Sequence, residues 1–125
     1  MNVARSFLLV GIAYLLAGMV LGSYMGAAGD HTLAPVHAHI NLLGFTLMAV
    51  FAAIYRVFPA MLESSLARYH FWLHQVGTFV LLGSLFLTMA GLVSEDSIAL
   101  LFPIAELSLI AATAIFGWNA LSRAR

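Results

Sequence analysis

Two histidines stand close together where the second apolar block of the chain begins. His37 and His39 lead into the run from Ile40 to Leu43, which only Asn41 interrupts. Imidazole nitrogens bind transition metals and haem iron, and an ionisable side chain at membrane depth is costly unless it has a function or a partner. We therefore expect the region of His37, His39 and Asn41 to be a cofactor-binding or metal-binding site.

The spacing of these two histidines separates their roles. On a regular helix, residues two apart project about 200° from one another, so both imidazoles could chelate one ion only if the helix began after His37. We expect His39 to act alone on its face, and His37 to share a face with Asn41. The neighbours of His39 on its face are Leu42, Leu43 and Thr46. Such an apolar wall suits the edge of a porphyrin better than a hydrated ion.

A second pair of histidines lies further along the chain. His70 and His74 are four residues apart, hence on one helix face, and with Glu63 they could bind zinc or copper. The interpretation that we favour is an interfacial belt whose polar ends lie among the headgroups. Its members would be Tyr69, His70, Trp72 and His74. His39 and His74 should differ in depth by roughly 15–20 Å, so one ion cannot join them.

Glu106 is a carboxylate within the fourth apolar block. Its depth should fall within about 5–7 Å of that of His39, so we expect an outer polar cluster of His37, His39, Asn41 and Glu106. There Glu106 could orient His39, ligate a metal or relay protons. Alternatively, it is protonated and bonded to Ser108, Thr113 or a neighbouring helix, where it ties the bundle together.

Four apolar blocks must position these side chains. The 125 residues are 63% hydrophobic and 8% charged, a composition that excludes an ordinary soluble domain. Each block is near the roughly 20 residues that a membrane-spanning helix requires. We predict one all-α domain over residues 1–125, an integral membrane four-helix up-down bundle with helices at about 6–26, 36–58, 70–92 and 98–118. The first block is expected to be retained, since no clear cleavage site follows it.

Charge and cysteine content narrow the function further. All basic residues fall on one side of this topology, at Arg5, Arg56, Arg68, Arg123 and Arg125. The positive-inside rule makes that side, with both termini, cytoplasmic, and we expect the inner membrane of a bacterium. A net charge of zero offers no surface for nucleic acid. The absence of cysteine excludes disulfides, iron–sulfur clusters and thiolate sites for haem or zinc.

The first apolar block carries a face of small residues. Gly11, Gly18, Gly22 and Gly26 fall on this face, which is the arrangement that lets two helix backbones approach closely in lipid. Packing inside the protomer is the favoured interpretation. The other expectation is a homo-oligomer formed through this face, or contact with a partner membrane subunit.

One run of residues resembles a known family. His39-Ile40-Asn41-Leu42-Leu43-Gly44-Phe45, before a helix ending in Tyr55-Arg56-Val57-Phe58-Pro59, resembles the second transmembrane helix of the haem-copper oxidase superfamily, especially its nitric oxide reductase and cbb3-type branches. The segment 66–73 is similar to the start of the family's third helix. The resemblance implies that the chain corresponds to the first four helices of a catalytic subunit, and that His39 is an axial ligand of a low-spin haem.

The same resemblance limits the expected activity. In that family the oxygen- or nitric-oxide-reducing centre and the second axial ligand come from later helices, which have no counterpart here, so stand-alone oxidase activity is not expected. The second ligand could be His39 of another copy across a two-fold axis, or His37 or His31 of the same chain. Without one, a five-coordinate haem could bind a gas.

Three functions follow from the sequence. The first and favoured one is a b-type haem protein for electron transfer or gas sensing, with His39 as ligand. The second is a copper- or zinc-binding membrane protein that uses the outer histidines with Glu106, or His70 with His74. Methionines could then assist copper, namely Met19, Met25, Met48 and Met89. The third is a cofactor-free accessory or assembly subunit of a larger respiratory complex.

Overall fold

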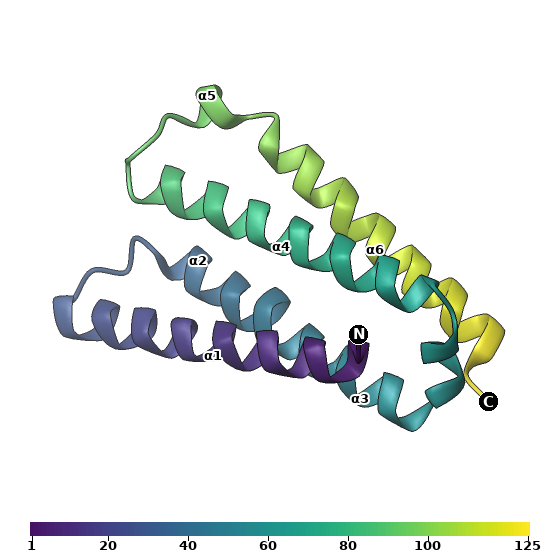
Figure 1. Ribbon diagram of the computed structural model, residues 1–125. Coiled ribbons are helices and arrows are strands. Elements are labelled where there is room, and N and C mark those ends of the chain that lie inside the picture. Colours follow the sequence, from purple (N-terminus) through teal and green to yellow (C-terminus); the bar gives the residue numbers. More distant parts are fainter.

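Four long apolar helices, packed as a bundle, make up most of the structure. The computed structural model describes residues 1–125 (Figure 1). The long segments are α1 (Val3–Ala28), the composite span Ala34–Val57, α4 (Leu66–Met89) and α6 (Leu101–Arg123). Each is long and apolar enough to cross a membrane. The predicted all-α class, with four helices that are candidate membrane spans, is confirmed.

The second span is not one continuous α-helix. It consists of α2 (Ala34–His39), the π-helical segment η1 (Ile40–Thr46) and α3 (Leu47–Val57). The Thr46 hydroxyl donates a hydrogen bond to the Asn41 carbonyl at 2.9 Å, five residues back. A π-helical turn widens the helix and shifts the register of the side chains before it relative to those after it, and such turns are frequent at functional sites. Here the turn begins directly after His39.

The other helix boundaries differ from the predicted ones by a few residues. Helix α4 begins at Leu66 rather than near residue 70. The Ser64 hydroxyl, just before the helix, accepts at 3.2 Å the Leu66 N–H, which has no partner within the helix. Gly91, at φ +69°, follows the end of α4. The one-turn helix α5 (Glu95–Ile98) then precedes α6, which therefore begins at Leu101 rather than near residue 98.

The long helices form two antiparallel hairpins. Helix α1 packs against η1 and α3, and α4 packs against α6 along its length, while α2 and α1 also contact α4. A 3₁₀ turn, η2 (Pro59–Glu63), joins the hairpins, and the Asn119 amide of α6 donates to the Met61 carbonyl of this turn at 2.9 Å. Both chain termini lie at the same end of the molecule (Figure 1).

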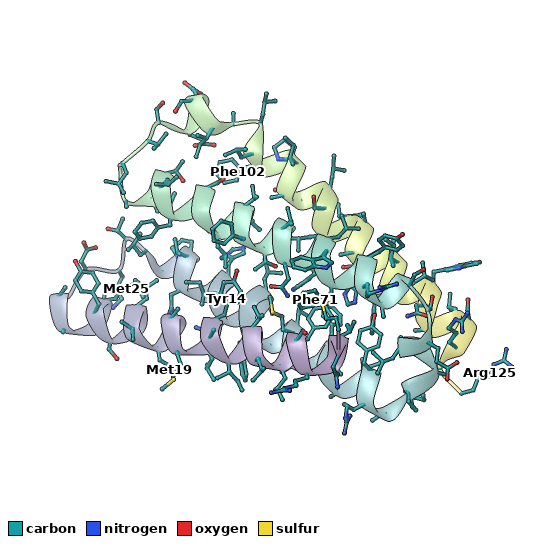
Figure 2. All side chains as sticks on the ribbon, in the orientation of Figure 1. Tyr14, Met19, Met25, Phe71, Phe102 and Arg125 are labelled. Carbon is teal, nitrogen blue, oxygen red and sulfur yellow. The ribbon has the colours of Figure 1, made fainter.

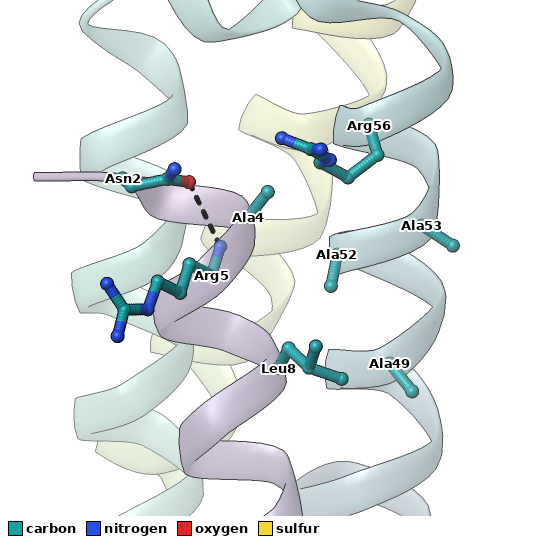
Figure 3. A pocket seen from close by; sticks show the side chains of 8 residues that line it. All are labelled: Asn2, Ala4, Arg5, Leu8, Ala49, Ala52, Ala53 and Arg56. Atoms are coloured by element: carbon teal, nitrogen blue, oxygen red, sulfur yellow. Dashed lines mark hydrogen bonds between the residues drawn. The ribbon is translucent and has the colours of Figure 1, made fainter.

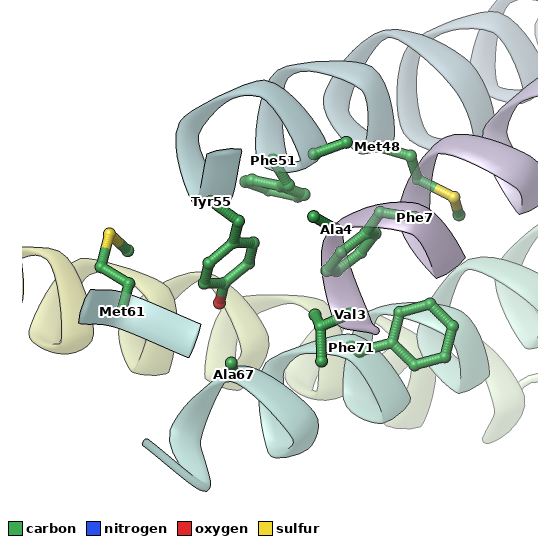
Figure 4. Close-up of a cluster of buried hydrophobic side chains, with 10 residues drawn as sticks. Val3, Ala4, Phe7, Met48, Phe51, Tyr55, Met61, Ala67 and Phe71 are labelled. Carbon is green, nitrogen blue, oxygen red and sulfur yellow. The ribbon is translucent and has the colours of Figure 1, made fainter. Parts of the chain in front are cut away.

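The hydrophobic core is concentrated at the end that carries the termini. Phe7 lies at its centre, fully buried, with its ring 4.9 Å from that of Phe71 in an edge-to-face arrangement. Figure 2 shows Phe71 pointing into the bundle, whereas Met19, further along α1, points away from it. The core residues are Val3, Ala4, Phe7, Met48, Phe51, Ala52, Tyr55, Met61, Ala67 and Phe71 (Figure 4).

Candidate functional site

His37 joins α2 to α1 through Nδ1 and bonds to Asn41 of its own span through Nε2. Its Nδ1 lies 2.9 Å from the Gly18 carbonyl, to which it must donate. Its Nε2 therefore accepts, and the Asn41 amide nitrogen lies 3.2 Å away as the donor. Since neither nitrogen is free in this arrangement, His37 acts as a structural tie between two helices and not as a ready ligand.

The glycine face of α1 makes this close approach possible. A Cβ atom at Gly22 would lie 2.8 Å from Cε1 of His37, and one at Gly18 would lie 2.7 Å from Oδ1 of Asn41. Gly11 meets α3 in the same way, whereas Gly26 faces open space. Gly11, Gly18 and Gly22 thus pack inside the protomer, as favoured from the sequence, whereas Gly26 does not. A homo-oligomer remains a prediction, and it needs a surface other than this one.

His39 has a different environment. Its Nδ1 donates to the Pro35 carbonyl, one turn back, at 2.7 Å. No group of the protein bonds to its Nε2, and the side chain is only half-buried. Leu42 and Thr46 are exposed further along the same span. This hydrogen bond fixes both the tautomer and the orientation of the His39 ring. It leaves the lone pair of Nε2 free to coordinate a metal ion.

Glu106 does not join the outer histidines. It is exposed on α6, and the described residues contain no group of three or more histidines and carboxylates that could hold a metal ion. Helix α6 packs mainly against α4 and has no extensive contact with α2, which explains the separation. The hydroxyls of Ser108 and Thr113 bond to carbonyls of their own helix, at 2.8 and 2.9 Å, so they do not tie Glu106 either.

His70 and His74 lie inside the bundle. Their side chains are 0% and 1% exposed, so their interpretation as interfacial belt residues is wrong, while Tyr69 and Trp72 are indeed exposed. The Tyr55 hydroxyl lies 3.0 Å from Nδ1 of His70, and Nε2 of His74 donates to the Leu43 carbonyl at 3.1 Å. The belt interpretation failed because α4 turns the face of His70 and His74 toward the other helices and the face of Tyr69 and Trp72 outward, and spacing along the chain does not fix this rotation.

Aromatic rings fill the space around His70. The ring centroids of Phe7, Phe51 and Phe116 lie 4.9, 4.4 and 5.0 Å from that of His70. Its Nε2 is buried without a hydrogen-bond partner, and the His74 ring centroid is 6.1 Å away. This inner cluster has two imidazoles but no carboxylate, since Glu63 is exposed, and the packed rings leave no room for a porphyrin.

Sequence reasoning missed two buried polar residues. Tyr55 is fully buried beside His70, and Asn119 is fully buried on α6 with Oδ1 unpaired. The available signal was a polar side chain within an apolar helix, which in lipid is expected to face the bundle interior.

The remaining candidate ligands are dispersed. His31 lies in the exposed loop before α2, beside Asp30. Two hydrogen bonds from Thr32 lower the pKa of the Asp30 carboxyl below its usual value. The four methionines considered for copper are not gathered at one point: Met48 and Met25 are buried in different parts of the bundle, and Met19 and Met89 are exposed.

Comparisons with protein-family models, with curated proteins and with solved structures find no match to this chain. The class of protein that the fold defines is a small four-helix candidate membrane protein.

Proposed function

We propose that this membrane protein binds a b-type haem through His39 and serves in electron transfer or gas sensing. The observation that carries the proposal is the bond from Nδ1 of His39 to the Pro35 carbonyl, at 2.7 Å, with Nε2 free. Axial imidazoles are typically held by a bond of this kind. The resemblance of the run His39–Phe45 to a haem-ligating helix supports the same role.

The other histidines fit a haem less well. Both nitrogens of His37 are engaged, and His70 is enclosed by phenyl rings. His31 lies in a loop and belongs to no apolar wall. His39 alone combines a free nitrogen with an accessible position at a membrane-spanning segment.

The proposed haem would be covered by this chain on one face only, so its other face needs further protein to cover it. None of the main cavities of the protomer is lined by His39, so the group would lie on the exposed surface near Leu42 and Thr46. We propose that a second copy covers it across a two-fold axis and supplies its own His39. A haem iron with two axial imidazoles is suited to the transfer of single electrons. The arginine-rich end would face the cytoplasm of a bacterium and His39 the outer half of its inner membrane.

Haem stoichiometry tests this arrangement. Titration of haem into the protein in mild detergent should saturate at one haem per two chains. His31→Ala should give the same stoichiometry, and His39→Ala should bind no haem. Because the chain has no cysteine, Leu42→Cys reports contact between copies without background. It should be joined to a second copy in membranes by a bifunctional thiol crosslinker long enough to span the haem, whereas Phe79→Cys, which is more exposed and lies on α4, should not. Saturation at one haem per chain would contradict the shared site.

A second candidate function rests on Glu106. An unpaired carboxylate on the exposed face of a membrane-spanning helix is costly in lipid, so a helix of another subunit would cover it in an accessory role. Single cysteines at Leu107 and at Val76 test this, since Leu107→Cys should crosslink to a different protein and Val76→Cys should not. Crosslinking at neither position would remove the support for this role.

Stoichiometric copper or zinc with no haem would instead favour a metal-binding protein.

A further inference from the structure

An open groove runs between α1 and α3 at the arginine-rich end of the bundle. Its volume is about 490 Å³. The wall on the α3 side is made of small side chains, Ala49, Ala52 and Ala53, and Leu8 faces them from α1. Figure 3 shows the Arg56 side chain extending from α3 toward α1, one turn beyond these alanines. Asn2 and Arg5 also line the groove on the α1 side. The floor between Leu8 and the alanines is thus apolar, and the groove is otherwise polar and cationic.

A second, polar cavity of about 430 Å³ adjoins this groove, and the two share Asn2 and Arg56. Arg68, Ser64 and Ser65 line the polar cavity together with one carboxylate, that of Glu63. Two arginines against one glutamate give its lining side chains a formal charge of +1. None of these arginine side chains forms a salt bridge within the protein. Their charge is therefore available to a bound anion.

We propose that the two cavities together bind one anionic phospholipid, with its headgroup at Arg56 and Arg68 and one acyl chain along the alanines. The distance from Arg56 to Ala49 is seven residues, or about 10 Å along the helix axis, so the apolar floor runs from the mouth well into the hydrocarbon region. Basic pockets between membrane helices are favourable for anionic headgroups, because they combine local charge with burial.

A zwitterionic lipid lacks the net negative charge that this mouth complements. A free phosphate ion has the charge but no chain to occupy the alanine groove. The combination of a cationic mouth with an apolar floor therefore favours an anionic lipid over both.

Native mass spectrometry of the full chain in mild detergent tests the proposal. Phosphatidylglycerol and phosphatidylcholine with identical acyl chains are titrated separately. We expect one tightly bound phosphatidylglycerol per chain, and an affinity about fivefold lower for each of Arg56→Gln and Arg68→Gln. Arg123→Gln is the matched control, because Arg123 is exposed at the same end of the bundle but lines neither cavity.

A second pair of variants tests the acyl groove. Ala53 is exposed, so Ala53→Phe should fill the groove without disturbing the core, and should lower phosphatidylglycerol binding. Ala111→Phe, at an exposed position of α6, should leave it unchanged. Equal binding of both lipids, equal losses in Arg56→Gln and Arg123→Gln, displacement of the lipid by millimolar inorganic phosphate, or full binding by Ala53→Phe would each overturn the proposal.

Discussion

The phenol oxygen of Tyr55 lies 3.0 Å from Nδ1 of His70, and this contact joins the two hairpins of the bundle. Tyr55 comes from α3 and His70 from α4, and both side chains are completely buried. A hydrogen bond between buried groups is worth little net, but leaving one partner unpaired is costly. The contact therefore helps to define how the hairpins meet.

Replacing this phenol should destabilise the bundle. Tyr55→Phe leaves Nδ1 of His70 buried and unpaired, and we expect a loss of about 1–3 kcal/mol in the free energy of unfolding. Tyr69→Phe is the control, because Tyr69 is exposed, and it should lie within about 0.5 kcal/mol of the wild type. Chemical denaturation in detergent, followed by circular dichroism, measures both. Equal stability of the two variants would show that the hydrogen bond has no structural role.

The glycine face of α1 leads to a second prediction. Gly22→Ala places a methyl group 2.8 Å from Cε1 of His37, so either α2 shifts or the imidazole turns away from the Gly18 carbonyl. Thermal unfolding should therefore occur at a lower temperature. Gly26→Ala meets nothing within 4 Å, and should be neutral or slightly stabilising, since alanine is the better helix former. The same effect from both substitutions would contradict the packing of α1 on α2.

Asn119 attaches α6 to the turn between the hairpins. Its amide donates to the Met61 carbonyl at 2.9 Å in a buried position. Asn119→Ala should cost about 1–3 kcal/mol, and protease cleavage in segment 59–63 should become faster. Ser122→Ala is the control for Asn119→Ala. It removes an exposed hydroxyl of the same helix that bonds only within α6, at 2.8 Å. Cleavage at the wild-type rate in Asn119→Ala would contradict the attachment.

The outer loop gives a pH-dependent prediction. Hydrogen bonds from the Thr32 hydroxyl and backbone N–H lower the pKa of the Asp30 carboxyl. A carboxyl with a depressed pKa in the folded state stabilises the fold above its ordinary pKa, and this contribution is lost as the pH falls through the folded value. Thr32→Val removes the side-chain bond, so the pKa of Asp30 should rise toward its ordinary value. Nuclear magnetic resonance titration measures it, and an unchanged pKa would contradict this contact.

The helix number and fold class could be predicted because the bilayer imposes them. A span needs about 20 apolar residues, and the chain contains four such blocks. The outward position of Tyr69 and Trp72 followed from the preference of such side chains for the interface.

Other features could not be predicted because they depend on helix rotation and on distant contacts. Rise along a helix predicts a depth for Glu106 but not the direction in which its side chain faces, and in the structure the side chain is exposed on α6. The surroundings of His70 come from α1, α3 and α6, which no local pattern brings together. The π-helical turn at Ile40–Thr46 has no sequence signal that we could use.

The dithionite-reduced minus oxidised absorption spectrum, recorded for the wild type and for His39→Ala purified from haem-replete cells, tests the central proposal most directly. The proposal predicts a Soret band with sharp reduced α and β bands in the wild type, their loss in His39→Ala, and their retention in His31→Ala. A wild type without iron or absorbance in the Soret region, or an unchanged spectrum in His39→Ala, would contradict it.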